Sequence, residues 1–376
     1  MRITNTMLVN NFLRNLNNNM HRVGHIQNQL ASGRRFANIS DDPVALIYSM
    51  NARNSMSRLS HYQRTVSSAH NWLEAVETGT MELQRKLAYV TEQIGNAATD
   101  AKTDHDRQNI AALIGQLRNH FVDTLNRSFS DHFVFGGYNT PGEAGIGQDG
   151  RILGPFRVHE TSGDLYFNSF NLSQFDGIPA EFLHMEISSD WGVAAGQITA
   201  IETALGMDLL LDHGVDPEDL FRMHMLKNDV KTFAVAPAVS IPVTMSGIDL
   251  VLFSSRTADG EPIVRNIFTT LSDLYTINAN PGSTAMQVHE FLRPVQDGQR
   301  HILTRTAEIG GRVRRLELLE ARFDQDRINY RRMLSDAEDV EYGETIMEWN
   351  MAQAIYQATL SAGARIIQPT LMDFLR

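Results

Sequence analysis

The chain has 376 residues, of which 42% are hydrophobic, 20% charged and 8% aromatic, and this composition predicts a water-soluble protein of two or three domains. No run of about 18 apolar residues occurs, and no apolar core of a signal peptide lies near the start, so we expect neither membrane insertion nor a cleaved leader. The net charge of -11 argues against nucleic-acid binding by the whole chain. The absence of cysteine excludes disulfides, thiolate metal sites and cysteine nucleophiles.

The first 40 residues hold five arginines, nine asparagines and no acidic residue. Asparagine disfavours helix interiors because its side chain competes for backbone hydrogen bonds. Nevertheless Val9, Leu16, Val23 and Leu30 recur every seven residues, as in one seam of a coiled coil. We therefore predict a terminal helix that is weak by itself and needs a partner.

A helix corner is predicted at Ser40, Asp41, Asp42 and Pro43. Asp42 can cap the next helix, Pro43 suits its first turn, and the carboxylates favour the positive end of the helix dipole. We expect this segment to set the angle between the terminal helix and the next one.

A long helical seam follows, with apolar residues that alternate three and four apart. Its members include Leu59, Val66, Leu73, Leu87 and Ile94. At 1.5 Å per residue the stretch from 59 to 94 is about 53 Å long, which indicates a coiled coil. A third helix is predicted from Ile110 to Leu125.

The far end of the chain has the same character. Val313, Leu316, Phe323 and Tyr330 continue a three-and-four alternation. After Gly343 a last helix is predicted, with Trp349, Tyr356 and Leu360 on one face. Few of its residues are charged, so we expect it to be buried against something.

The middle, roughly residues 141–262, differs from both ends and is predicted to be β-rich. Hairpin-type turns are expected at Asp149-Gly150, Asp176-Gly177 and Asp259-Gly260, a strand at 163–170, and a short helix from Pro217. The predicted fold class is α+β, in which the terminal helices from 1–42 and 343–376 form one domain. Segments 43–140 and 263–342 form an antiparallel helical rod, into which the middle domain is inserted.

We find no convincing catalytic, cofactor or metal site. The segment 145–150 has the letters of a dinucleotide fingerprint but no strand before it and no amphipathic helix after it, so a surface turn is the better interpretation. His21 and His25 are four apart but lack a third metal ligand, and Asp104-His105-Asp106 suits a capped turn better than acid-base chemistry. A non-enzymatic protein without cofactors is predicted.

Five short segments carry a family resemblance. They are Arg2-Ile3-Thr4, Leu30-Ala31-Ser32-Gly33-Arg34-Arg35, Phe133-Val134-Phe135-Gly136-Gly137-Tyr138-Asn139-Thr140, Ile309-Gly310-Gly311-Arg312 and Gln368-Pro369-Thr370-Leu371-Met372-Asp373-Phe374-Leu375. Together with the corner at Ser40, they resemble the flagellin superfamily, and within it the hook-associated proteins of the hook-filament junction. Flagellin itself is the nearest rival, but it usually has Lys-Asp-Asp-Ala-Ala-Gly where this chain has Ser40-Asp41-Asp42-Pro43-Val44-Ala45.

The resemblance implies a structural adaptor outside the cell that joins the flagellar hook to the filament. Its implied partners are further copies of itself, the first hook-associated protein and flagellin. It also implies export through the flagellar type III apparatus with a chaperone that masks the C-terminal helix. Two alternatives stay open: a flagellin subunit, and a surface adhesin or glycan-binding module on the middle domain.

Overall fold

A computed structural model of the protein describes residues 5–36, 38, 40–98, 103–137, 154–159, 162–183, 215–228, 230–257 and 259–366. The predicted α+β class is confirmed, because helices from both ends of the chain dominate and the middle supplies short antiparallel strands. The chain divides into two compact units: Met1–His61 with Arg322–Arg376 (unit 1), and Tyr62–Ala321 (unit 2).

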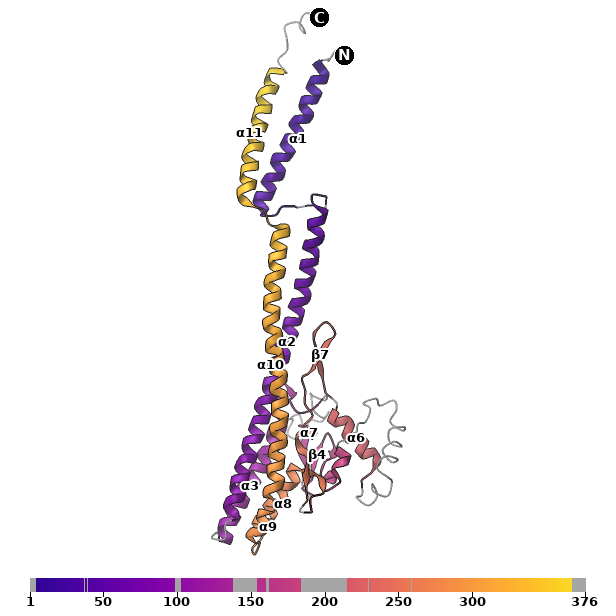
Figure 1. The fold of residues 1–376 in the computed structure, drawn as a ribbon, viewed down its shortest axis with the longest axis vertical. Coiled ribbons are helices and arrows are strands. Elements are labelled where there is room, and N and C mark those ends of the chain that lie inside the picture. Colours follow the sequence, from indigo (N-terminus) through magenta and orange to yellow (C-terminus); the bar gives the residue numbers. More distant parts are fainter. Residues whose placement is uncertain are drawn as a thin grey trace, which may run out of the picture. The chain divides into compact units, whose positions relative to one another are not determined.

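Unit 1 contains the two terminal helices, α1 (Asn5–Ser32) and α11 (Tyr342–Ile366). They lie side by side and antiparallel, so that the N-terminal end of α1 and the C-terminal end of α11 lie at the same end of the unit (Figure 1). α1 stops at Gly33, whose φ of 68° is the left-handed conformation of a helix C-cap. This positive φ favours glycine, and a Cβ here would also lie 2.8 Å from the Tyr342 hydroxyl oxygen.

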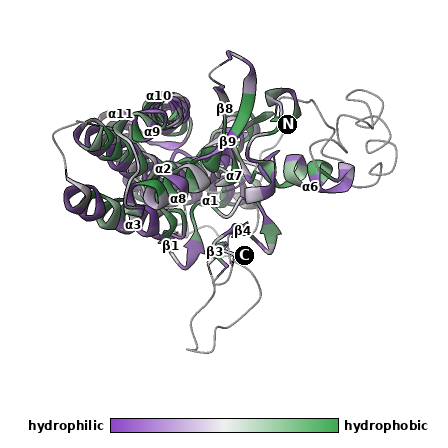
Figure 2. Ribbon diagram, turned by 90° about the horizontal axis from the view of Figure 1, so that it is seen from below, coloured by the Kyte–Doolittle hydropathy of each residue, from purple (hydrophilic) through white to green (hydrophobic). Residues whose placement is uncertain are grey.

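Two long helices run through both units: α2 (Pro43–Ala97) and α10 (Leu292–Glu338). In unit 2 they are joined by α3 (Asp104–Leu125), α8 (Ile267–Ala279) and α9 (Ala285–His289). Figure 2 shows both hydrophobic and hydrophilic residues on these helices, as amphipathic packing requires. The double glycine at Gly310 does not interrupt α10. None of the described helices has the length and apolarity that a membrane crossing needs.

α3 and α8 pack closely through a small residue and a stacked cation. Gly115 lets the Tyr275 ring approach to 3.2 Å of the position a Cβ would take. The guanidinium of Arg118 lies 5.5 Å from the centre of the Phe268 ring and 5.7 Å from that of Tyr275. α3 begins as predicted at a capped turn, in which Thr103 and Asp106 form a reciprocal capping box.

In the parts of the middle that the structure describes, and in the residues flanking it, four small sheets form, each of antiparallel neighbours in chain order. Their strands are β1 (Ser128–Phe129) with β2 (His132–Phe133); β3 (Phe156–Val158), β4 (Leu165–Phe167) and β5 (Phe170–Asn171); β6 (Thr232–Ala236) with β7 (Val239–Pro242); and β8 (Leu252–Arg256) with β9 (Pro262–Asn266). Short helical elements accompany them: η1 (Ser173–Phe175), η2 (Ala180–Leu183), α6 (Pro217–Asn228) and α7 (Ile248–Val251).

Two predicted features of the middle are wrong. Residues 163–170 do not form one strand, because Asn168 and Ser169 have φ of 47° and 69° and turn the chain between β4 and β5. Asp176-Gly177 is not a hairpin turn. The Asp176 carboxylate instead accepts hydrogen bonds from the backbone N–H of Asn266 and the hydroxyl of Thr269, 2.9 and 2.8 Å away, where α8 begins.

Other predictions for the middle are confirmed. The turn at Asp259-Gly260 joins β8 to β9, with φ of 91° at Gly260. The predicted short helix is α6, and the Asp216 carboxylate accepts the backbone N–H of Glu218 (2.9 Å) in its first turn. Asp149-Gly150 and the fingerprint-like segment 145–150 lie outside the described residues.

Phe135 and the neighbouring Gly136 form a packing centre of unit 2. The Phe135 ring lies 2.7 Å from the position of a Cβ on Gly79 of α2, so any side chain at position 79 would clash with it. Its carbonyl accepts the backbone N–H of Gly247 (2.9 Å), and Gly136 pairs with Ser246. This block therefore ties the strand region to α2.

A charged cluster holds α6 and α7 against α10 within unit 2. Arg305 Nη2 donates to Asp249 Oδ1 (3.1 Å), Lys227 Nζ lies 3.8 Å from the same oxygen, and His301 Nε2 donates to the Asp249 carbonyl (2.6 Å). Burial lowers the pKa of the His301 imidazole, which is therefore neutral at pH 7. Removing one partner would leave a buried charge unpaired.

Candidate assembly surface

The contact between α1 and α11 is narrow and depends on small residues. Ile26 of α1 and Ala352 of α11 are 3% and 4% exposed. Gly363 lies so close to the Phe12 ring that a Cβ would overlap it. Near the middle of the contact, Asn19 Nδ2 donates to Thr359 Oγ1 (2.9 Å). Only one side of each terminal helix is covered in this way.

Many large apolar side chains of unit 1 remain exposed. They are Met7, Leu8, Leu13 and Met20 on α1; Val44, Ile47, Tyr48 and Met50 on α2; Ile328 and Met333 on α10; and Tyr342, Ile346, Met347, Met351, Ile355 and Leu360 on α11. Met347 and Met351, one turn apart, are 61% and 59% exposed. Single exposed apolar residues are ordinary, but such a concentration on neighbouring helices is typical of a protein-protein interface.

The predicted seam residues fall into three groups. Leu59, Val66, Leu73, Leu87, Ile94, Leu316 and Phe323 are buried; Val9, Leu16, Val23, Leu30, Val313, Tyr330, Trp349 and Tyr356 are half-buried; Leu360 is 44% exposed. The side of α11 that faces α1 is occupied by Ala352, Thr359 and Gly363, which leaves Leu360 turned away.

The predicted corner caps α2. Asp42 Oδ1 accepts the backbone N–H of Ala45 (2.9 Å), and Pro43 is the first helical residue. The hydrogen bond from Ala45, aided by Arg35, lowers the pKa of Asp42. Arg35 Nη2 donates to Asp42 Oδ2 (2.9 Å), and Asp41 accepts the backbone N–H of Asn38 (2.9 Å). The connection between α1 and α2 is therefore held by its own side chains.

A hydrogen-bond network around Glu338, at the end of α10, was not predicted. Its carboxylate accepts hydrogen bonds from Arg53 Nε (2.7 Å) and from the Ser49 hydroxyl, both on α2. The Glu338 backbone carbonyl accepts a hydrogen bond from the backbone N–H of Arg35 (2.7 Å). The Gly33 carbonyl accepts one from the backbone N–H of Val340 (3.0 Å). These bonds join the α1-α2 connection to the α10-α11 connection.

The charge of Glu338 is maintained by its partners. Its side chain is only 8% exposed, yet the hydrogen bond from Arg53, with help from Ser49, lowers its pKa. The sequence offers one hint of this role: an acidic residue in the last turn of a helix meets the negative end of the dipole and calls for a compensating cation. Periodicity alone cannot identify Ser49 and Arg53 as its partners.

Nothing in the described part of the chain suggests bound metal: no group of three or more His, Cys, Asp or Glu side chains converges there. His25 is exposed and its Nε2 lies 3.1 Å from Gln29 Nε2, without a third ligand nearby.

Comparisons with known proteins agree with this picture. Residues 3–140 match the bacterial flagellin N-terminal helical region. The chain is 22% identical over 370 residues to flagellar hook-associated protein 3 of Escherichia coli, covering 96% of each chain.

Two solved structures have the same fold. A putative flagellar hook-associated protein from Vibrio parahaemolyticus aligns with a TM-score of 0.53 at 17% identity, over 80% of this chain and 100% of the other. The flagellar junction protein FlgL from Legionella pneumophila aligns with a TM-score of 0.50 at 11% identity, over 78% and 100%. These comparisons confirm the resemblance seen in the sequence: the chain is similar to flagellar hook-associated protein 3 along its length and to bacterial flagellins in its N-terminal helical region.

Proposed function

We propose that this protein is a structural subunit of the bacterial flagellum that joins the hook to the flagellin filament. The observation that carries the proposal is the uncovered apolar surface of α1 and α11, in a chain similar over 96% of its length to a hook-associated protein. Burying a side chain such as Met347 in a neighbouring subunit contributes roughly 1.5–3 kcal/mol. Because those gains exist only in an assembly, the surface favours a subunit over a monomeric protein.

The chemistry of this surface suits a subunit that must contact two different neighbours. Met7, Met20, Met50, Met347 and Met351 are all exposed in unit 1. Methionine is unbranched and polarisable, so it adapts to partners of different shape. An adaptor has one face toward the hook and another toward the filament, and it needs such tolerance more than a subunit that contacts only its own kind.

We assign the parts of the chain accordingly. Residues 1–42 and 343–376 form the axial core of a tube, 43–140 and 263–342 form the helical part around it, and 141–262 face outward. The terminal helices are covered on one side only, which supports their place in the core. The neighbours are further copies of this chain, the first hook-associated protein on the hook side and flagellin on the filament side.

The protein reaches its site outside the cell through the flagellar type III export apparatus. A chaperone that covers the apolar α11 before export would prevent premature association. The exposed Ile346, Met347, Met351 and Ile355 on that helix are the side chains such a chaperone would shield.

Electron microscopy of cells that lack the protein tests the proposal. We expect hooks without filaments, flagellin lost to the medium, and restoration by the gene in trans. Normal filaments in the deleted strain would contradict the proposal. Purified protein that polymerises alone into long filaments would instead favour a flagellin subunit.

A further inference from the structure

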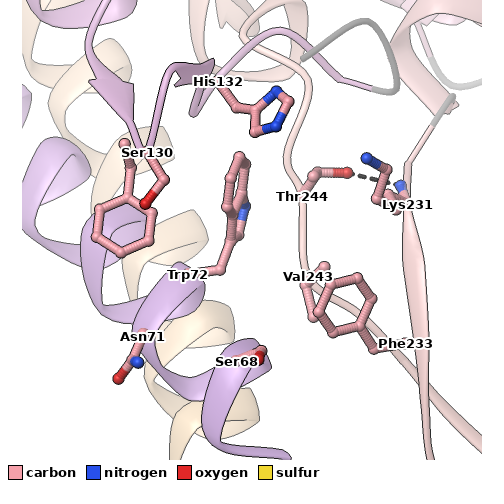
Figure 3. Close-up of a pocket in the computed structure, with 10 residues that line it drawn as sticks. Ser68, Asn71, Trp72, Ser130, His132, Lys231, Phe233, Val243 and Thr244 are labelled. Atoms are coloured by element: carbon pink, nitrogen blue, oxygen red, sulfur yellow. Dashed lines mark hydrogen bonds between the residues drawn. The ribbon is translucent and has the colours of Figure 1, made fainter. Parts of the chain in front are cut away.

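A pocket lined entirely by residues of unit 2 has no part in the proposed function. It has a volume of about 420 Å³ and lies between α2, the β1-β2 hairpin and the segments around β6 and β7 (Figure 3). Ser68, Asn71 and Trp72 reach it from one face of α2, since residues three and four apart share a helix face. The volume is in the range of pockets that hold small molecules.

Aromatic rings form the walls of the pocket. The Phe129 ring meets the Trp72 indole edge-on, with the ring centres 6.1 Å apart, and the His132 ring lies 6.5 Å away. Phe233 and Val243 line the opposite side, so the space between is bounded by apolar faces (Figure 3). Such walls accept a saturated ring that has C–H groups on one face, because the negative face of an aromatic ring attracts their partial positive charge.

Hydrogen-bond donors line the same space. The Trp72 Nε1–H is buried and has no hydrogen-bond partner in the described structure. An indole nitrogen can only donate, so the atom that satisfies it must be an acceptor. Thr244 is 1% exposed and its Oγ1 accepts the backbone N–H of Lys231 (2.6 Å), which leaves its own hydroxyl proton to donate to a ligand.

The lining includes a basic side chain. Lys231 contributes an ammonium group, and none of the described lining residues is acidic, although the chain as a whole has a net charge of -11. Hydroxyl and amide groups at Ser68, Asn71 and Ser130 complete the rim. The pocket thus offers aromatic walls, several side chains that can hydrogen-bond to hydroxyl groups, and one basic side chain.

We propose that this pocket binds a single sugar ring that carries a carboxylate, of the hexuronic acid class. The C–H face of the ring packs between Trp72 and Phe233, a ring or carboxylate oxygen accepts the indole N–H, and the carboxylate lies toward Lys231. The rim groups hydrogen-bond to the sugar hydroxyls, which a plain aromatic acid does not have. The site would give unit 2 a ligand-binding role in addition to the proposed structural role of the protein in the flagellum.

Sodium D-glucuronate, methyl D-glucopyranoside and sodium benzoate are the probes that test the proposal. Titrations of the full-length protein, followed through the ¹⁵N-indole NMR signals of its three tryptophans, should shift one signal. We expect glucuronate to bind with a Kd of about 1 mM, since a ligand of this size has a limited number of contacts. The glucoside, without a carboxylate, and benzoate, without hydroxyls, should each bind about tenfold more weakly.

Two variants and one control locate the site. Trp72→Phe keeps an aromatic wall but removes the N–H, and should remove the responsive signal and weaken glucuronate binding about tenfold. Lys231→Met should abolish the preference for glucuronate over the glucoside. Trp349→Phe, at a half-buried tryptophan of unit 1, should change neither.

Several outcomes would overturn the proposal. These are no indole shift at about 50 mM glucuronate, far above the expected Kd, benzoate or the glucoside binding as tightly as glucuronate, or Trp72→Phe binding like the wild type. If Trp72→Phe does not fold, the preference lost in Lys231→Met decides the question. Because these measurements use the purified protein, their failure is independent of the flagellar phenotype.

Discussion

At the scale of single residues, Glu338 shows how the side chain and the backbone of one residue can together link two connections between helices. Its carboxylate accepts hydrogen bonds from Ser49 and Arg53 of α2, and its backbone carbonyl accepts one from the backbone N–H of Arg35. The guanidinium of Arg53 is half-exposed, so solvent screens part of the ion pair. The geometric role of Glu338 is therefore at least as important as its electrostatic contribution.

Glu338→Gln should destabilise unit 1. The substitution keeps the shape of the side chain but replaces an acceptor oxygen with an NH₂ group that faces two donors. We expect a loss of about 1–3 kcal/mol in the free energy of unfolding, measured by urea denaturation. Glu341→Gln, at a nearby exposed glutamate, should change that free energy by no more than about 0.5 kcal/mol.

The same carboxylate predicts a pH dependence. The pKa of Glu338 in the folded protein is below its ordinary value of 4.5, so folding favours the charged form. Its contribution to stability is fully present above about pH 4.5 and is lost as the pH falls through the lower, folded-state pKa. Urea midpoints measured between about pH 3 and 6 should fall less steeply in Glu338→Gln than in the wild type. Parallel curves for the two proteins would contradict this assignment.

At the scale of helices, the pairing of α1 with α11 depends on the absence of a side chain at Gly363. In an ordinary helix interior, alanine is favoured over glycine by about 0.5–1 kcal/mol. At Gly363 the new Cβ would overlap the Phe12 ring and force it out of the contact. Gly363→Ala should therefore lower the melting temperature or leave it unchanged, despite the better propensity.

Gly24→Ala is the matched control for that prediction. A Cβ at Gly24 of α1 would meet no atom within 4 Å, so only the propensity gain remains. Its melting temperature should rise, as followed by circular dichroism. Equal rises in the two variants would show that the Phe12 contact does not restrict α11.

The corner before α2 is expected to govern assembly more than stability. Asp42 and Pro43 fix the start of α2, but the carboxylate is well exposed to solvent. Asp42→Ala combined with Pro43→Ala should leave the melting temperature nearly unchanged. It should reduce incorporation at the hook tip and raise the amount of secreted, unassembled protein, as measured by immunoblotting. Wild-type motility and junction occupancy would mean that the segment has no geometric role.

Helices with strong periodicity could be predicted from the sequence, and short strands could not. Leu73 lies on α2, inside a repeat several heptads long, and is fully buried. By contrast β4 and β5 are three and two residues long, too short for an alternating pattern to separate them from the turn between them. Asn168 and Ser169 in left-handed conformation give that turn a signal weaker than Asn-Gly.

The candidate surface was predictable in outline but not in its details. An apolar last helix with few charges indicated a partner, and the exposed Met347 and Met351 agree with that expectation. Which side of α11 faces α1 depends on Gly363 and Ala352, and their role is visible only when both helices are placed. Bonds between residues far apart in the chain, such as Ser49 with Glu338, leave no mark on local periodicity.

At the scale of the whole molecule, stability and assembly are carried by different residues. The largest fully buried side chains, among them Phe121, Phe135 and Leu73, lie in unit 2, whereas most of the exposed large apolar residues lie in unit 1. Unit 2 has the buried core of an ordinary domain, and unit 1 exposes apolar side chains of the kind found at protein-protein interfaces. Substitutions on that surface should accordingly affect the flagellum without affecting the folded monomer.

Met347→Asp tests this separation. Met347 is 61% exposed, so the purified variant should melt at the same temperature as the wild type. In an assembly the aspartate would be buried without a partner and the packing of the methionine would be lost, at a cost of several kcal/mol per subunit. Cells with this variant should be non-motile, with the protein and flagellin both recovered from the medium.

Met286→Asp provides the matched control, because Met286 of α9 is 77% exposed but belongs to unit 2. It makes the same chemical change and should likewise leave the melting temperature unchanged. Motility and filament length should stay at wild-type levels, since this methionine lies outside the surface assigned to assembly. If both variants abolish motility, or neither does, the interface is not confined to unit 1, and the terminal helices lose their special place in the proposed function.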